Sequence, residues 1–256
     1  MSGNNFFTDF YENSGFDGSL VQTGKNHTEN GYLQNEEALE YFKRKQFDWN
    51  SILTATSSTA ALGLLGMPIF ALVGSIGALL SLELSISVDR IVSVMELLLE
   101  EFKDEEITIT PRVKTSTGMI DLIVRTADGR YFALLLRSNG ESKVLWRAER
   151  QEFYTVRKGT KSKWSGLELS GERLNRMMLS LKEEKNPLVA ISNAERKKGF
   201  TKTIVLTGKT KLDINNDPTL MVKFGCTTAL RMSGTSTYYL VERANLADFL
   251  RKPVEK

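Results

Sequence analysis

The sequence has few of the residues that metal sites and nucleophilic triads use, with one cysteine, Cys226, and one histidine, His27, among 256 residues. A structural zinc site needs about four Cys or His ligands, so a single chain cannot assemble one. The same shortage argues against disulfide frameworks and against Cys/His or Ser/His/Asp catalysis. Binding remains, or chemistry carried out by carboxylates, Lys, Ser or Tyr, and we expect no resident metal or cofactor.

Charge is unevenly distributed along the chain. Residues 1–50 carry four basic and eight acidic groups, residues 51–110 carry two and eight, and residues 111–256 carry 28 and 15. The small overall charge of +3 therefore hides an acidic N-terminal part and a basic C-terminal part. A basic surplus attracts polyanions, so the predicted partners are nucleic acid or anionic lipid headgroups. The alternative is a solvated surface that keeps the protein soluble.

The first 35 residues are rich in Asn, Gly and Ser and have no apolar period, which predicts a disordered acidic tail over residues 1–35. No basic start followed by an apolar segment is found there, so we expect no cleavable signal peptide. From Asn35 the pattern changes to that of a helix, with acidic residues at its start and the basic residues 43–45 further along.

A run of 34 residues without charge lies between Asp48 and Glu83. This run meets the length of a membrane span, about 20 residues, and predicts a helical membrane anchor in the segment 36–104. One geometry is a single tilted helix kinked at Pro68. The other, which we favour, is a hairpin that turns at residues 66–68, because Gly66 suits a helix end and proline suits a helix start. A buried hairpin in a soluble helical domain is the alternative to membrane attachment.

Two further features of this segment bear on its packing and orientation. Small residues recur at helical spacing and would let two helices approach closely; they are Ala55, Thr59, Gly63, Gly74 and Ala78. The basic residues 43–45 lie just outside the uncharged run, so the positive-inside rule places that flank in the cytoplasm. In a hairpin, the basic domain returns to the same side, which predicts a membrane-associated protein with its basic domain facing the cytoplasm.

An apolar stripe continues along the second helix, at steps of three and four residues, through Val88, Ile91, Met95, Leu98 and Phe102. Such a stripe is a seam for another helix or for a sheet face. We expect it to pack in the core, and the alternative is self-association or a protein partner bound through the Val88–Phe102 stripe.

The period changes to two after Glu106, which predicts strands in residues 106–117, 119–138, 202–212 and 235–243. Residues 144–159 are compatible with a helix, and residues 171–186 form a good amphipathic helix. The predicted fold class is α+β, with a long N-terminal helical hairpin followed by a mixed-sheet domain over residues 105–256.

The order of a helix with acidic residues, a strand, the strand Gly118–Val124, a turn at Asp128–Gly129 and the strand Tyr131–Arg137 resembles the core of the PD-(D/E)xK, or restriction-endonuclease-like, superfamily. Nuclease-related domains with the motifs IDxxV and GxFxIExK come closest. The resemblance covers less than a fifth of the chain. It implies that Asp121 takes the place of the first metal-binding acid and Arg137 that of the lysine.

The family's second carboxylate, two residues before the lysine, is Leu135 in this chain. A Mg²⁺ ion positioned for phosphodiester hydrolysis needs about two converging carboxylates, so we expect the site to be inactive. The alternative is a metal-dependent endonuclease with a relocated acid, in which Asp121, Arg137 and Glu100 would be catalytic and Mg²⁺ the cofactor. Other candidates for the relocated acid are Glu96, Glu101 and Glu141.

Basic and aromatic residues alternate between Arg137 and Trp164, a pattern that suits phosphate contacts and base stacking. The predicted binding residues are Lys143, Trp146, Arg147, Arg150, Arg157, Lys158, Lys161, Lys163 and Trp164. The function favoured by the sequence is a membrane-anchored, non-catalytic protein whose basic nuclease-like domain docks on nucleic acid or another anionic partner. A membrane scaffold or assembly factor without a nucleic-acid role is a third alternative.

Overall fold

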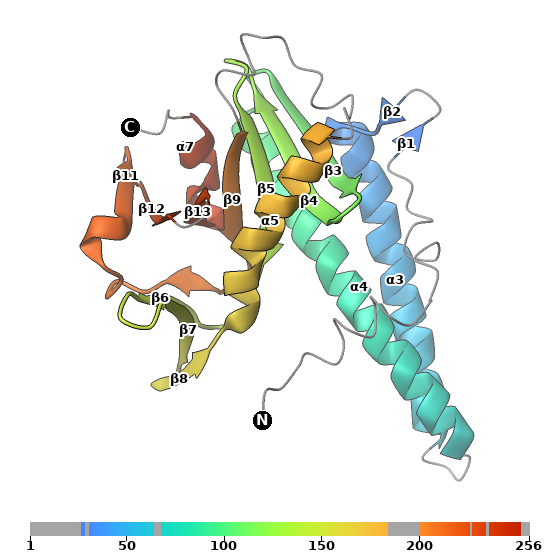
Figure 1. Ribbon diagram of the computed structural model, residues 1–256. Coiled ribbons are helices and arrows are strands. Elements are labelled where there is room, and N and C mark those ends of the chain that lie inside the picture. Colours follow the sequence, from blue (N-terminus) through green and yellow to red (C-terminus); the bar gives the residue numbers. More distant parts are fainter. Residues whose placement is uncertain are drawn as a thin grey trace.

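The computed structural model describes residues 27–28, 31–63, 68–183, 200–225, 227–233 and 236–251, and it is an α+β structure (Figure 1). Most of the predicted tail, residues 1–26, 29 and 30, lies outside the described residues. The chain begins with two paired two-residue strands and two long helices; these are β1 (His27–Thr28), β2 (Gly31–Tyr32), α3 (Asn35–Gly63) and α4 (Pro68–Glu101).

The two long helices pack against each other as a hairpin that extends beyond the sheet (Figure 1). Helix α4 begins at Pro68, where proline costs no helical hydrogen bond, and the predicted turn residues before it lie outside the described residues. Small residues bring the helices close, as the sequence indicated for Gly74. A Cβ atom on Gly74 would lie 2.7 Å from the Cα of Ala60 and 2.9 Å from the carbonyl oxygen of Thr56. Further along, Ser85 donates to Asn50 at 2.6 Å.

The predicted membrane anchor is wrong. Within the described residues, no helix is long and apolar enough to cross a membrane. The uncharged run is divided between α3 and α4, and α3 exposes a polar surface of Ser51, Thr54, Ser57 and Ser58, while α4 continues into the charged residues Glu83, Asp89 and Arg90. The predictions of a membrane-associated location, of a domain oriented to the cytoplasm and of a membrane scaffold fall with the anchor.

The main sheet has seven strands in the order β11-β12-β13-β9-β5-β4-β3. Strands β3, β4 and β5 form an antiparallel meander, and β9 and β13 run parallel to β5. Strand β12 is antiparallel to β13, and β11 is antiparallel to β12. Their bounds are β3 (Ile107–Thr115), β4 (Gly118–Thr126), β5 (Tyr131–Arg137), β9 (Phe200–Leu206), β11 (Met221–Phe224), β12 (Thr227–Ser233) and β13 (Thr237–Glu242).

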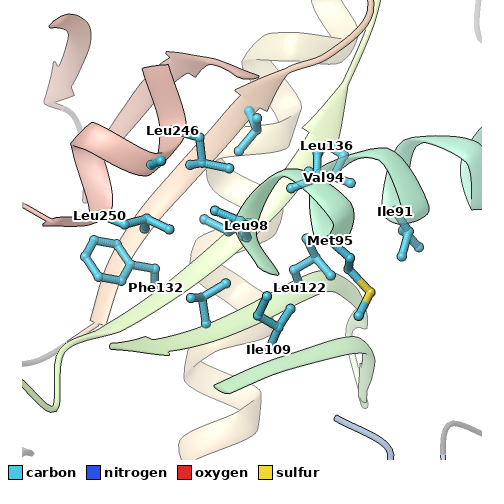
Figure 2. Close-up of a cluster of buried hydrophobic side chains, with 14 of the residues drawn as sticks. Ile91, Val94, Met95, Leu98, Ile109, Leu122, Phe132, Leu136, Leu246 and Leu250 are labelled. Atoms are coloured by element: carbon cyan, nitrogen blue, oxygen red, sulfur yellow. The ribbon is translucent and has the colours of Figure 1, made fainter. Parts of the chain in front are cut away.

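Helices cover both faces of this sheet. The stripe predicted on α4 packs on one face, as expected, since Val88, Ile91, Met95, Leu98 and Phe102 are all buried in one cluster with side chains of the strands and of α7 (Leu246–Arg251) (Figure 2). The opposite face carries α5 (Ser165–Glu183), whose apolar side packs on β3, β4 and β5. The chain's own sheet thus covers the stripe that was also a candidate for self-association.

A second, four-stranded sheet has the order β10-β6-β7-β8, with β6 (Lys143–Arg147), β7 (Glu152–Arg157), β8 (Thr160–Lys163) and β10 (Lys211–Leu212). The helix considered for residues 144–159 is therefore wrong. Along β7, Phe153 and Thr155 are buried, whereas Glu152, Tyr154 and Val156 are half-buried, which is the alternation of strands rather than the period of a helix. A 3-10 turn, η2 (Pro218–Leu220), and another, η3 (Arg243–Asn245), complete the described elements.

Candidate anion-binding site

The main sheet opens between β4 and β5 at Asp121. Strand β4 pairs with β3 from Gly118 to Thr126 except at Asp121 and the facing Arg112, and its pairing with β5 runs only from Leu122 to Arg125. The side-chain alternation is also interrupted there, because Leu122 packs on the α4 face and Ile120, two residues earlier, packs on the α5 face. Polar groups from both faces can therefore meet at this position.

The Asp121 carboxylate occupies the opening. Its Oδ2 atom accepts a hydrogen bond from the backbone N–H of Leu136 at 2.7 Å, in place of the missing ladder bond. The same oxygen lies 3.5 Å from Nη1 of Arg137. The two side chains retain 20% and 27% of their exposure, so the pair is reachable from solvent.

The guanidinium of Arg137 is held in a fixed orientation. Its Nε donates to the hydroxyl of Ser170 on α5 at 2.9 Å, and its Nη1 donates to the carbonyl of Leu136 at 2.8 Å. The Ser170 hydroxyl donates onward to the carbonyl of Gly166 at 2.7 Å. Among the described residues, Nη2 of Arg137 has no hydrogen-bond acceptor, so one edge of the fork is available to a ligand.

Arg112 lies opposite Asp121, on the neighbouring strand β3. Its backbone has φ of 52°, a left-handed conformation that costs an arginine about 1–3 kcal/mol and that tends to occur at functional sites. Its Nη2 donates to Ser87 on α4 at 2.9 Å, while its Nε is buried without an acceptor. Burial lowers the pKa of Arg112, and the nearby Asp121 carboxylate opposes that shift.

Arg90 approaches the same carboxylate from α4. Burial lowers the pKa of Arg90 and the like charge of Arg137 lowers it further, while the carboxylates of Asp121, Asp89 and Glu83 raise it. Within the described part of the chain, the Arg90 guanidinium has no hydrogen bond and no ion pair. Arg137 on β5 therefore pairs with the Asp121 carboxylate, and Arg90 on α4 and Arg112 on β3 interact with it electrostatically. We call Arg90, Arg112 and Arg137 the arginine cluster.

The arginine cluster does not fit a metal centre of the nuclease type. The position of the second acid is held by Leu135, which is 1% exposed and packs under α5. The single carboxylate already accepts hydrogen bonds, and the surrounding guanidinium groups would repel a cation. No three His, Cys, Asp or Glu side chains of the described residues converge as metal ligands would.

The candidates for a relocated acid form ion pairs with side chains outside the arginine cluster. Glu100 pairs with Lys103 and lies ten residues from Arg90, about 15 Å along the helix axis. Glu96 pairs with Lys43, Glu101 with Arg251, and Glu141 with Lys209. Asp121 and Arg137 are thus together, and Glu100 is not beside them.

The predicted basic patch is split between the two faces of the small sheet. The cross-strand register places Lys143, Arg147, Tyr154, Lys161 and Lys163 on the outer face. Arg147 lies over the ring of Tyr154, 5.9 Å from its centroid, and Arg150 donates to its hydroxyl at 3.4 Å. Lys163 pairs with Glu152, and Arg157 and Lys158 lie at the exposed end of the β7–β8 hairpin.

The two tryptophans of the predicted patch do not share this outer face. Trp146 and Trp164 pack instead against an apolar cluster under the small sheet, which includes Val144, Phe153 and Leu167. The outer face therefore offers cations and one tyrosine to a polyanion, without a tryptophan for base stacking.

Sequence reasoning missed Arg90 and Arg112. One signal pointed to Arg90, which is the sole basic residue between Lys45 and Lys103 and sits on a helix that is otherwise largely apolar. Nothing local identified Arg112, since its place opposite Asp121 follows from the pairing of β3 with β4.

Comparison with known proteins gave no match, whether to protein-family models, to curated proteins or to solved structures.

Proposed function

We propose that this protein binds nucleic acid by seating a backbone phosphate on the arginine cluster. The observation that carries the proposal is that three guanidinium groups, those of Arg90, Arg112 and Arg137, share the Asp121 carboxylate at the opening of the sheet. The further acids near Arg90 are Asp89 and Glu83 on its own helix. Guanidinium groups bind phosphate oxygens through paired, charge-assisted hydrogen bonds. A phosphate would supply acceptors to Arg90 and to Nη2 of Arg137, which have none among the described residues.

The arrangement of the chain around the cluster supports this proposal. The order α4, β3–β5, α5 and β9, with β9 parallel to β5, is compatible with the restriction-endonuclease-like resemblance. In that comparison, the cluster stands at the position that faces the phosphodiester. The outer face of the small sheet adds Lys143, Arg147 and Lys161 as further cations that can follow a nucleic-acid backbone.

The test measures fluorescence anisotropy of the full chain with a short labelled DNA duplex and with the RNA duplex of the same sequence. Arg90→Gln is the first variant, because its side chain loses no hydrogen bond to the described residues. The expected result is an affinity about tenfold lower for the variant, the value of one charge-assisted contact. Arg137→Gln is expected to act in the same direction.

Arg231→Gln provides the matched control. Arg231 is an exposed arginine on β12, which β13, β9 and β5 separate from β4, so the change in net charge is the same while the arginine cluster is intact. Equal losses in Arg90→Gln and Arg231→Gln would show that net charge alone drives binding, and would contradict the proposal. Cleavage of either duplex that requires Mg²⁺ and is lost in Asp121→Ala would replace it with the endonuclease alternative.

A further inference from the structure

A cleft of about 570 Å³ lies between α5, the β6–β7 hairpin, η2 and the facing ends of β12 and β13. Helix α5 and strands β6, β7, β12 and β13 are labelled in Figure 1. This volume is in the range of small-molecule sites. Aromatic side chains from three strands line it: Trp146, Phe153 and Tyr238. The ring of Trp146 packs on the fully buried ring of Phe153, with 4.7 Å between the centroids, so Phe153 supports Trp146 from behind and Trp146 forms the aromatic wall of the cleft.

Among the described residues, the charged side chains that line the cleft are all acidic. Glu168 and Glu172 come from α5, and Asp217 precedes η2. Glu168 accepts the backbone N–H of Phe153 at 3.0 Å, and Lys163 lies 3.9 Å from its other oxygen, outside the lining. Asp217 accepts from Thr219. Glu172 has no hydrogen bond or ion pair within the described residues, so its full charge faces the cleft.

Tyr238 provides a neutral polar group beside these acids. Burial, then the charges of Glu168 and Glu172, raise the pKa of Tyr238 to about 12, so its hydroxyl remains protonated at neutral pH. The ring lies directly against the backbone of Gly171, where a Cβ would be 2.5 Å from two ring carbons. The aromatic face and the hydroxyl are therefore held in place by the helix.

We propose that this cleft binds an organic cation, a guanidinium or alkylammonium group on an apolar stem, between the aromatic wall and Glu172. Cations are attracted to aromatic faces, and carboxylates add direct charge pairing. The site is separate from the arginine cluster and has the opposite charge. The same chemistry is presented by a free arginine derivative and by an arginine side chain in a peptide.

The experiment titrates the full chain with Nα-acetyl-arginine amide and with its citrulline counterpart in isothermal titration calorimetry. The two ligands have nearly the same shape, and only the first carries a charge. Saturable binding of the arginine ligand, with the citrulline ligand weaker by tenfold or more, is the expected result. An acetylated Gly-Arg-Gly amide distinguishes the sources, since tighter binding of the peptide would indicate a partner segment and equal binding a free ligand.

Glu172→Gln is expected to lower the affinity about fivefold, the effect of one partly exposed charge pair. The matched control is Glu183→Gln, an exposed glutamate at the far end of α5, which is expected to bind normally. Tyr238→Phe reports on the hydroxyl. Lack of saturable binding of the arginine ligand, equal binding of the citrulline ligand, or equal losses in the two glutamine variants would each overturn the proposal.

Discussion

The Nε atom of Arg137 lies 2.9 Å from the hydroxyl of Ser170, and this hydrogen bond ties the end of strand β5 to the first turns of helix α5. Ser170 is buried, with 2% exposure, and its hydroxyl donates a hydrogen bond to the carbonyl of Gly166. The bond therefore fixes the Arg137 guanidinium beside Asp121 while leaving Nη2 available to a ligand.

Ser170→Ala removes this positioning hydrogen bond and keeps the arginine. We expect nucleic-acid affinity to fall about threefold to tenfold, because the guanidinium must be ordered by the ligand instead. The free energy of unfolding should fall by about 1 kcal/mol, the net contribution of a single hydrogen bond. Anisotropy and thermal unfolding measure the two effects. Ser180→Ala, at the other end of the same helix and bonded to Ser116, is the control, and an equal loss of affinity there would contradict the positioning role.

Two glycines of α5 are expected to respond to alanine with opposite signs. At an ordinary helical position, Gly→Ala stabilises by up to about 1 kcal/mol. A Cβ on Gly166 would meet Trp164 at 3.7 Å, a normal contact, so Gly166→Ala is expected to be neutral or stabilising. A Cβ on Gly171 would overlap the ring of Tyr238, so Gly171→Ala should destabilise by about 1–3 kcal/mol. Urea unfolding of both variants checks the difference; equal shifts would show that the ring moves freely.

The close approach of α3 and α4 depends on Gly74. Its missing side chain lets the backbone of Ala60 pack directly against α4, and neighbouring backbone atoms cannot move aside as a side chain can. Gly74→Ala is expected to lower the free energy of unfolding by about 1–3 kcal/mol. Ser75→Ala, at the exposed adjacent position, should leave it within about 0.5 kcal/mol. Circular dichroism during urea unfolding measures both, and similar stabilities would contradict this packing.

Alkaline pH is expected to destabilise the fold through Tyr238. Its pKa in the folded protein is about 12, against 10.0 for an ordinary tyrosine. Between these pH values the folded state retains a proton that the unfolded state has released. The contribution of Tyr238 to the free energy of unfolding is therefore complete below pH 10 and is lost as the pH rises towards 12. Tyr238→Phe should therefore flatten the fall of the urea midpoint above pH 10. A fall that is unchanged in Tyr238→Phe would refute the assignment.

The elements of the fold were largely predictable, because their signals are local. The stripe from Val88 to Phe102 identified the core face of α4, and Leu98 and Met95 do lie over the sheet beside Leu122 and Phe132 (Figure 2). The hairpin followed from the position of Pro68. Its membrane role was wrong because the absence of charge was counted along the chain, whereas the run belongs to two helices that pack on each other, one with an exposed Ser/Thr surface.

The candidate site was predictable only in part. Asp121 and Arg137 stand in neighbouring strands of a recognisable pattern, and the structure brings them within 3.5 Å. The roles of Arg90 and Arg112 depend on how α4 crosses the sheet and on the pairing of β3 with β4, which no local pattern encodes. Trp146 was assigned to the binding patch because basic and aromatic residues are interleaved along this part of the chain. The strand register instead places it beside Phe153, where it packs inward.

The salt dependence of nucleic-acid binding tests whether a phosphate binds at the arginine cluster. Each phosphate contact contributes about one unit to the slope of log K against log salt concentration. We expect Arg90→Gln and Arg137→Gln each to reduce the steepness of that slope by about one unit for a DNA duplex. Arg231→Gln should leave the slope unchanged. A wild-type slope that neither cluster variant alters would show that no phosphate binds at the arginine cluster.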